Sequence, residues 1–119
     1  MRSFVIPGRR AILAGVVALC LPLVAMAQQA DISGSYLAEG RNPDGSAYQG
    51  VAQIAERDGS VQIDWTVGGQ NYSGSGVRDG LVVVVNWGES APVVYVVMAN
   101  GDLHGTWNNG TALERLSRR

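Results

Sequence analysis

Lysine is absent from this chain, and histidine and cysteine occur once each. The single cysteine, Cys20, lies in an N-terminal segment that we expect to be removed. The remaining domain would then have no disulfide and no cysteine to pair with His104, which excludes the usual zinc ligand sets. Residues 28–119 carry 6 arginines against 10 acidic groups, a charge of −4. This lysine-free, acidic composition argues against nucleic acid and anionic membrane as partners.

Residues 1–27 have the pattern of an export signal. Three arginines precede an apolar run at 11–25, and Ala25-Met26-Ala27 forms an A-x-A cleavage site. We therefore predict a signal peptide over 1–27 and a single mature domain over 28–119, located in the periplasm or secreted. A retained anchor, lipidation at Cys20 and a twin-arginine export route are the alternatives.

Glycine-containing turn signals divide the mature chain at short, regular intervals. They are Asn42-Pro43-Asp44-Gly45, Asp58-Gly59, Gly68-Gly69, Asp79-Gly80, Asn100-Gly101 and Asn109-Gly110, with a longer break at 88–92. Between them lie eight strand candidates: 31–39, 46–56, 61–67, 72–78, 81–87, 93–98, 103–107 and 111–117. Short links favour hairpins, and eight strands suffice for a meander to close. The sequence predicts an all-β, up-and-down antiparallel barrel of about eight strands, with a layout like that of avidins and lipocalins.

The aromatic side chains of the mature domain are spread one to a strand over the first seven predicted strands. They are Tyr36, Tyr48, Trp65, Tyr72, Trp87, Tyr95 and Trp107. In a barrel of eight strands such rings either fill the interior or line a mouth that holds one small, apolar ligand. All seven are therefore candidate ligand-binding residues.

Two predicted strands, 81–87 and 93–98, are apolar on both faces. If Val83 and Tyr95 point inward, an outer patch results, made of Val82, Val84, Val94, Val96 and Met98. A strand that is apolar on both faces is usually covered on both. We predict an interface with a protein partner or a second copy; the alternative is cover by the chain's own termini.

Groups that could perform catalysis are few and scattered. His104 is expected on the outer face of its strand, and no serine has the context of an activated nucleophile. Glu56 and Asp58 flank a turn, where we expect them to be solvated. Glu114 is ambiguous, because Leu113 and Leu116 belong to opposite faces of its strand; if buried, it needs a partner such as a tyrosine hydroxyl. No catalytic residue, metal site or cofactor is predicted.

Several spaced motifs resemble a set of small exported bacterial β-proteins. The similarity covers about 33–116 and includes GRNPDGSxYxG at 40–50, WxxGGxxYxGxG at 65–76 and NGxLxGxW at 100–107. Most members of that set have no assigned function, and some carry a fibronectin-binding label. The resemblance implies an exported binding protein and supplies no site residue.

Taken together, the sequence predicts an exported, non-enzymatic binding protein that engages a protein partner through the outer patch. Two alternatives remain: a small-molecule carrier that uses the aromatic interior, and an inhibitor of an extracytoplasmic hydrolase.

Overall fold

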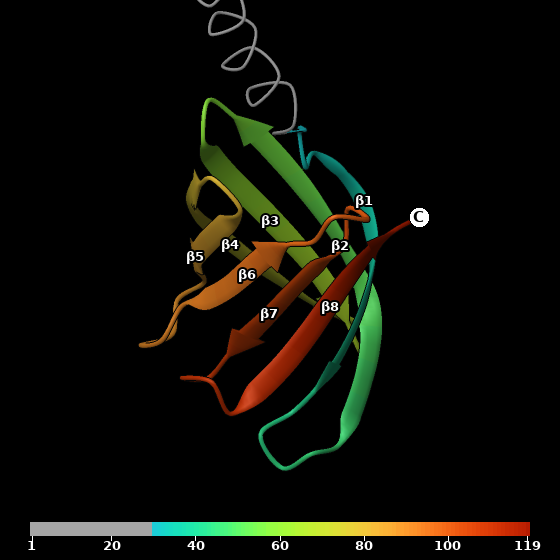
Figure 1. Cartoon of the computed structure of the whole chain (residues 1–119). Helices are drawn as coiled ribbons and strands as arrows, with labels where there is room; N and C mark the ends of the chain where they lie inside the picture. Colours follow the sequence, from blue (N-terminus) through green and yellow to red (C-terminus); the bar gives the residue numbers. More distant parts are fainter. Residues whose placement is uncertain (1–29) are drawn as a thin grey trace, which may run out of the picture. The chain divides into compact units, whose positions relative to one another are not determined.

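The computed structural model describes residues 30–119, and these form a closed antiparallel barrel of eight strands (Figure 1). The strands are β1 (Gly34–Arg41), β2 (Ala47–Arg57), β3 (Ser60–Val67), β4 (Gln70–Asp79), β5 (Val82–Asn86), β6 (Val93–Val97), β7 (Leu103–Trp107) and β8 (Ala112–Arg118). Each strand pairs with the next, and β8 pairs with β1. The predicted barrel is thus confirmed. The predicted signal peptide at 1–27 lies outside the described residues.

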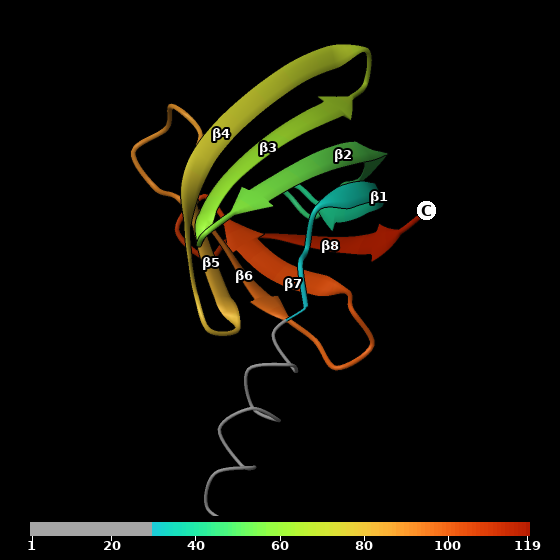
Figure 2. The same cartoon turned by 90° about the horizontal axis from the view of Figure 1, so that it is seen from above.

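Turn chemistry and alternating polarity explain this path. Asp58 and Gly59 have φ angles of 52° and 82°, and Gly68 and Gly69 have 59° and 79°. Two successive positive φ angles define the hairpin turn that fits the right-handed twist of strands, and Asp-Gly and Gly-Gly tolerate it. Between these turns, β3 alternates exposed and buried residues along its length. The sheet that results curves around a shared interior (Figure 2).

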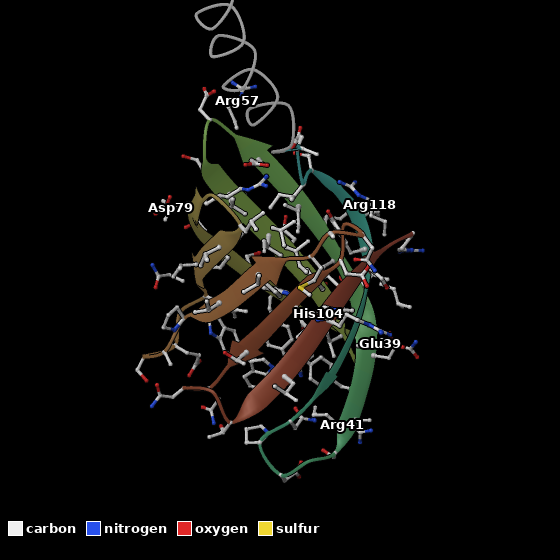
Figure 3. All side chains as sticks on the ribbon, viewed as in Figure 1. Glu39, Arg41, Arg57, Asp79, His104 and Arg118 are labelled. Atoms are coloured by element: carbon white, nitrogen blue, oxygen red, sulfur yellow. The ribbon has the colours of Figure 1, made fainter. Side chains whose placement is uncertain are left out.

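The two ends of the barrel differ in their connections. One end carries the β1–β2, β3–β4, β5–β6 and β7–β8 links, and we call it the cup end. The other end carries the β2–β3, β4–β5 and β6–β7 links together with residues 31–33, and we call it the plug end. Arg41, where β1 finishes, lies toward the cup end, and Arg57, where β2 finishes, lies toward the plug end (Figure 3). Fully buried side chains, among them Ile63, Val83 and Leu103, fill the barrel between them.

An ion pair closes the plug end. Arg78 Nη1 lies 3.0 Å from Glu56 Oε1, and the two side chains are only 6% and 12% exposed. The backbone N–H of Ile32 donates to the same carboxylate oxygen at 3.0 Å, and the Tyr36 hydroxyl donates to the Ile32 carbonyl at 2.7 Å. The expectation that Glu56 is solvated was therefore wrong. Glu56 shares the inward face of β2 with Ile54, so the strand carries it into the barrel before the turn begins.

The outer surface of β5 and β6 is apolar, as the sequence predicts. Val82, Val96 and Met98 are 40%, 44% and 39% exposed, and Val84 and Val94 are half-buried. Val77 on β4 extends the surface, because it pairs with Val84 and is 59% exposed. We call these six residues the valine strip. The C-terminus does not cover it, since the Arg119 N–H donates to the carbonyl of Ser35 in β1.

No helix in residues 30–119 is long and apolar enough to span a membrane.

Candidate functional site: an aromatic cup around Glu114

A cavity of about 430 Å³ occupies the cup end of the barrel. Its walls come from six of the eight strands and from the β1–β2 and β5–β6 links. The lining residues are Asn42, Tyr48, Trp65, Val67, Tyr72, Trp87, Glu89, Val93, Trp107 and Glu114. We call this cavity the aromatic cup.

Glu114 lies at the centre of a row of inward-facing residues that crosses five adjacent strands. The strand registers place them in the order Tyr48, Gly40, Glu114, Gly105 and Tyr95. The two glycines leave space that the two tyrosine rings occupy. A Cβ at position 105 would lie 2.5 Å from Cδ1 of Tyr95, and a Cβ at position 40 would collide with the Tyr48 ring. Tyrosine can therefore lie flat against the wall, with its hydroxyl directed toward the carboxylate.

Three donors surround the carboxylate of Glu114. The Tyr48 hydroxyl donates to Oε1 at 2.8 Å, and Trp65 Nε1 donates to Oε2 at 3.0 Å. The Tyr95 hydroxyl makes a short hydrogen bond to Oε2. Glu114 is only 8% exposed, and such a buried charge requires hydrogen-bond partners of this kind.

The directions of these hydrogen bonds follow from the donors. An indole N–H only donates, so Trp65 must give its proton to an acceptor. Trp107 Nε1 donates to the Tyr48 hydroxyl at 3.0 Å, which leaves the proton of that hydroxyl free to point at Glu114. A network of donors that converges on one carboxyl group suits its ionised form, which only accepts hydrogen bonds.

The tyrosines of this network are held neutral. Burial, and then the charge of Glu114, raise the pKa of Tyr95 well above its usual value of 10.0. The same two causes raise the pKa of Tyr48. Both hydroxyls therefore keep the protons that they donate to Glu114 at neutral pH.

Four of the aromatic rings that line the cup form a chain in which each ring contacts the next edge to face. Tyr48 and Trp107 have centroids 6.1 Å apart at 65°, Trp107 and Trp87 are 5.7 Å apart at 85°, and Trp87 and Tyr72 are 6.3 Å apart at 66°. Edge-to-face contacts are a favoured aromatic geometry. Because each ring is turned steeply against the next, the wall encloses a space and does not form one flat platform.

The structure brings together most of the aromatic residues that the sequence singled out. Five of the seven line the cup: Tyr48, Trp65, Tyr72, Trp87 and Trp107. Tyr95 contacts Glu114 from deeper in the barrel. Tyr36 does not line the cup: it lies at the plug end, fully buried, with its ring 5.1 Å from the Arg118 guanidinium carbon. Alternation along a strand predicts which side chains point into the barrel, but it does not predict their position along the barrel axis.

Four lining residues were not candidates from the sequence. Asn42 and Glu89 lie in connections, and Val67 and Val93 lie at strand ends. The sequence feature that these four residues share is that each lies in, or next to, a link at the cup end of the barrel. For Glu114 the ambiguity is resolved, because Ala112, Glu114 and Leu116 face inward and Leu113 is 53% exposed.

Polar residues outside the cup line a second pocket, which is formed by β1, β2, β7 and β8 and includes Glu39, Arg41, His104 and Arg115. His104 is exposed on the outside of β7, as predicted, with Nε2 4.0 Å from Asp102 Oδ2 (Figure 3). Over residues 30–119, no group of three or more His, Cys, Asp or Glu residues is arranged to hold a metal ion.

Comparison with known proteins supports the fold alone. No family model matches the chain, and no curated protein matches it at a significant level. Among solved structures, a redesigned β-barrel matches with a TM-score of 0.54 and 15% sequence identity, over 74% of this chain and 91% of that one. This chain is therefore similar in architecture to a designed barrel, and the similarity carries no information on function.

Proposed function

We propose that the protein binds a small molecule in the aromatic cup. The observation that carries this proposal is a cavity of about 430 Å³ at one end of the barrel, lined by three tryptophans, two tyrosines and a buried carboxylate. Small-molecule sites are typically concave, about 300–1,000 Å³ in volume, and mostly apolar with a few polar groups that orient the ligand. The cup has each of these properties. Among the functions that the sequence left open, this observation favours the small-molecule carrier.

The tryptophans provide a direct test of this proposal. The chain has three, and all of them line the cup, so tryptophan fluorescence, excited selectively, reports on this site. Titration of the purified protein with compact aromatic alcohols and amines should give a saturable change in emission, and calorimetry should give the same affinity. A flat response in both measurements across the panel would overturn the proposal.

Two substitutions on β4 provide a matched pair. Tyr72 lines the cup and is 39% exposed, whereas Val77, on the outer face of the same strand, is 59% exposed. Tyr72→Ala removes one ring of the wall, so we expect binding about three- to tenfold weaker. Val77→Ala should leave the affinity unchanged. Equal effects of the two substitutions would contradict binding in the cup.

The valine strip supports a second candidate function, which is contact with another protein. Its exposed members form a continuous apolar surface across β4, β5 and β6, and such surfaces mark protein interaction sites. Export to the periplasm or the cell exterior remains part of both proposals and rests on residues 1–27. Detection of the mature N-terminus at Gln28 by mass spectrometry would test it.

A further inference from the structure

Resting on the proposed function, we infer that the preferred ligand of the aromatic cup is a protonated amine on a compact aromatic or aliphatic body. The sequence alone suggests an apolar ligand, because it shows only the rings. The structure adds the position of a carboxylate among them and shows which charges share the cavity.

The charges of the lining residues are of one sign. Glu114 lies at the inner wall and Glu89 lies in the β5–β6 link, while none of the arginines in residues 30–119 lines the cup. Arg78 is paired with Glu56 at the plug end, and Arg118 lies over the Tyr36 ring at the same end. An anionic ligand such as a fatty acid would meet two carboxylates and no positive group in this cavity, so its binding is disfavoured. A cation would be attracted to it.

The aromatic rings of the cup also favour a positively charged ligand. Aromatic faces attract cations, most strongly when the cation is removed from water, and tryptophan is the most effective of the three aromatic residue types. Trp107 contacts both Tyr48 and Trp87 edge to face, at 65° and 85°. Rings held at these angles to one another can surround a compact chemical group of a ligand. They do not offer the single flat platform on which a sugar or an extended planar ring would stack.

Glu114 has one acceptor position left for a ligand. A carboxylate can accept about four hydrogen bonds, two at each oxygen. Oε2 already accepts from Trp65 and Tyr95, and Oε1 accepts from Tyr48. The second lone pair of Oε1 is therefore available to an N–H donor. This distinguishes a protonated amine, which can donate, from a quaternary ammonium, which cannot.

Three ligands of nearly the same size and differing in charge test this inference: 2-phenylethylammonium, 2-phenylethanol and 3-phenylpropionate. With the wild-type protein at neutral pH, tryptophan fluorescence and calorimetry should show that the ammonium binds at least about tenfold more tightly than the alcohol. Both can donate a hydrogen bond to Glu114, but only the ammonium adds an ion pair with the carboxylate and a cation–π contact with the rings. The carboxylate should bind most weakly. Replacement of the ammonium group by trimethylammonium should lower the affinity.

Glu114→Gln should remove most of the preference for the ammonium over the alcohol while the alcohol still binds, and the rings and Glu89 account for what is left. Glu89→Gln, which changes a charge in the link and leaves the hydrogen-bond network intact, should reduce the preference by about twofold or less. If Glu114→Gln does not fold, the comparison of the three ligands with the wild-type protein decides the question by itself.

The outcomes separate the two proposals. Equal affinities for the three ligands, or tightest binding of the carboxylate, would overturn the inference and leave small-molecule binding in place. No saturable binding of any of the three by either method would remove the proposed function, and the inference with it.

Discussion

Tyr95 is the most deeply buried hydroxyl in the network around Glu114, with no exposed surface. Its ring fills the space above Gly105, and its hydroxyl contacts Oε2 of the carboxylate. Burial and the charge of Glu114 both disfavour the phenolate, so the pKa of Tyr95 lies well above 10.0. The unfolded chain lacks both effects, and there the same group ionises near its usual value of about 10.

This difference predicts a loss of stability in alkali. The folded pKa of Tyr95 is raised, so its contribution to the free energy of unfolding is complete below about pH 10 and is lost as the pH rises further. Between the two pKa values the unfolded chain has released a proton that the folded protein retains. The free energy of unfolding should then fall by about 1.4 kcal/mol per pH unit for this one group.

Urea unfolding of the wild type and of Tyr95→Phe at several pH values between about 9 and 11 measures this slope. The variant loses a hydrogen bond and is less stable at every pH, but its stability should fall less steeply as the pH rises. Parallel pH dependence of the two proteins would show that Tyr95 ionises in the folded state as readily as in the unfolded state.

At the scale of the strands, β5 and β6 are apolar on both faces, and only one face is covered by the barrel. Val83, Val85, Val93 and Tyr95 are buried, and the residues that alternate with them, Val82, Val84, Val94 and Val96, belong to the valine strip. Val84 and Val96 lie on different strands of the strip. An aspartate at each would place two charges within any contact made through this surface, and burying unpaired charges is costly.

Sedimentation measures whether the protein self-associates through the valine strip. If the valine strip is an interface between copies, the wild-type protein should self-associate, and Val84→Asp combined with Val96→Asp should leave a folded monomer. Because both side chains point outward, circular dichroism of the double variant should match that of the wild type. A wild-type protein that is already monomeric at high concentration would rule out self-association through the strip.

The strands were the part of the structure that local sequence could predict. Each hairpin is encoded over a few residues: Asp58-Gly59 supplies the positive φ angles, and Val61, Ile63 and Trp65 alternate after it. The same local pattern placed His104 on the outer face. Closure of β8 against β1 follows once eight such hairpin strands are counted, because an uncapped edge would otherwise be exposed.

The pairings across the interior could not be predicted in this way. Glu56 and Arg78 are 22 residues apart, and Tyr48 and Glu114 are 66 apart. Which side chains meet depends on the stagger of the strands, and no single strand carries that information. Glu56 was expected in solvent because it lies close to a turn. Tyr36 was grouped with the aromatic residues of the cup because alternation along a strand shows which side chains point inward but does not show how far along the barrel axis they lie.

At the scale of the whole barrel, the ion pair of Arg78 and Glu56 and the aromatic cup lie at opposite ends. A layer of fully buried side chains, including Ile63, Val83 and Leu103, separates them. Removing one partner of a buried ion pair leaves an uncompensated charge, which typically costs about 3–5 kcal/mol. The smaller figure applies to Glu56→Gln, because the glutamine can still accept from the Ile32 N–H that now bonds to Glu56.

We expect Glu56→Gln to lower the free energy of unfolding by about 3 kcal/mol in urea denaturation, and Arg78→Met, which leaves the Glu56 carboxylate without its ion-pair partner, to lower it by about 3–5 kcal/mol. The double variant should lose less than the sum of the two, because neither charge is then left alone in the barrel. Additive losses would show that the two groups stabilise the plug end independently.

The same variants test whether the two ends act separately. In the variants that fold, the affinity for 2-phenylethylammonium should stay within about twofold of the wild-type value, because no residue of the ion pair lines the cup. Stability would then change while binding does not, which is the behaviour of a rigid barrel that carries its site at one end. A parallel loss of affinity and stability would show that closure of the plug end shapes the cup through the packed layer between them.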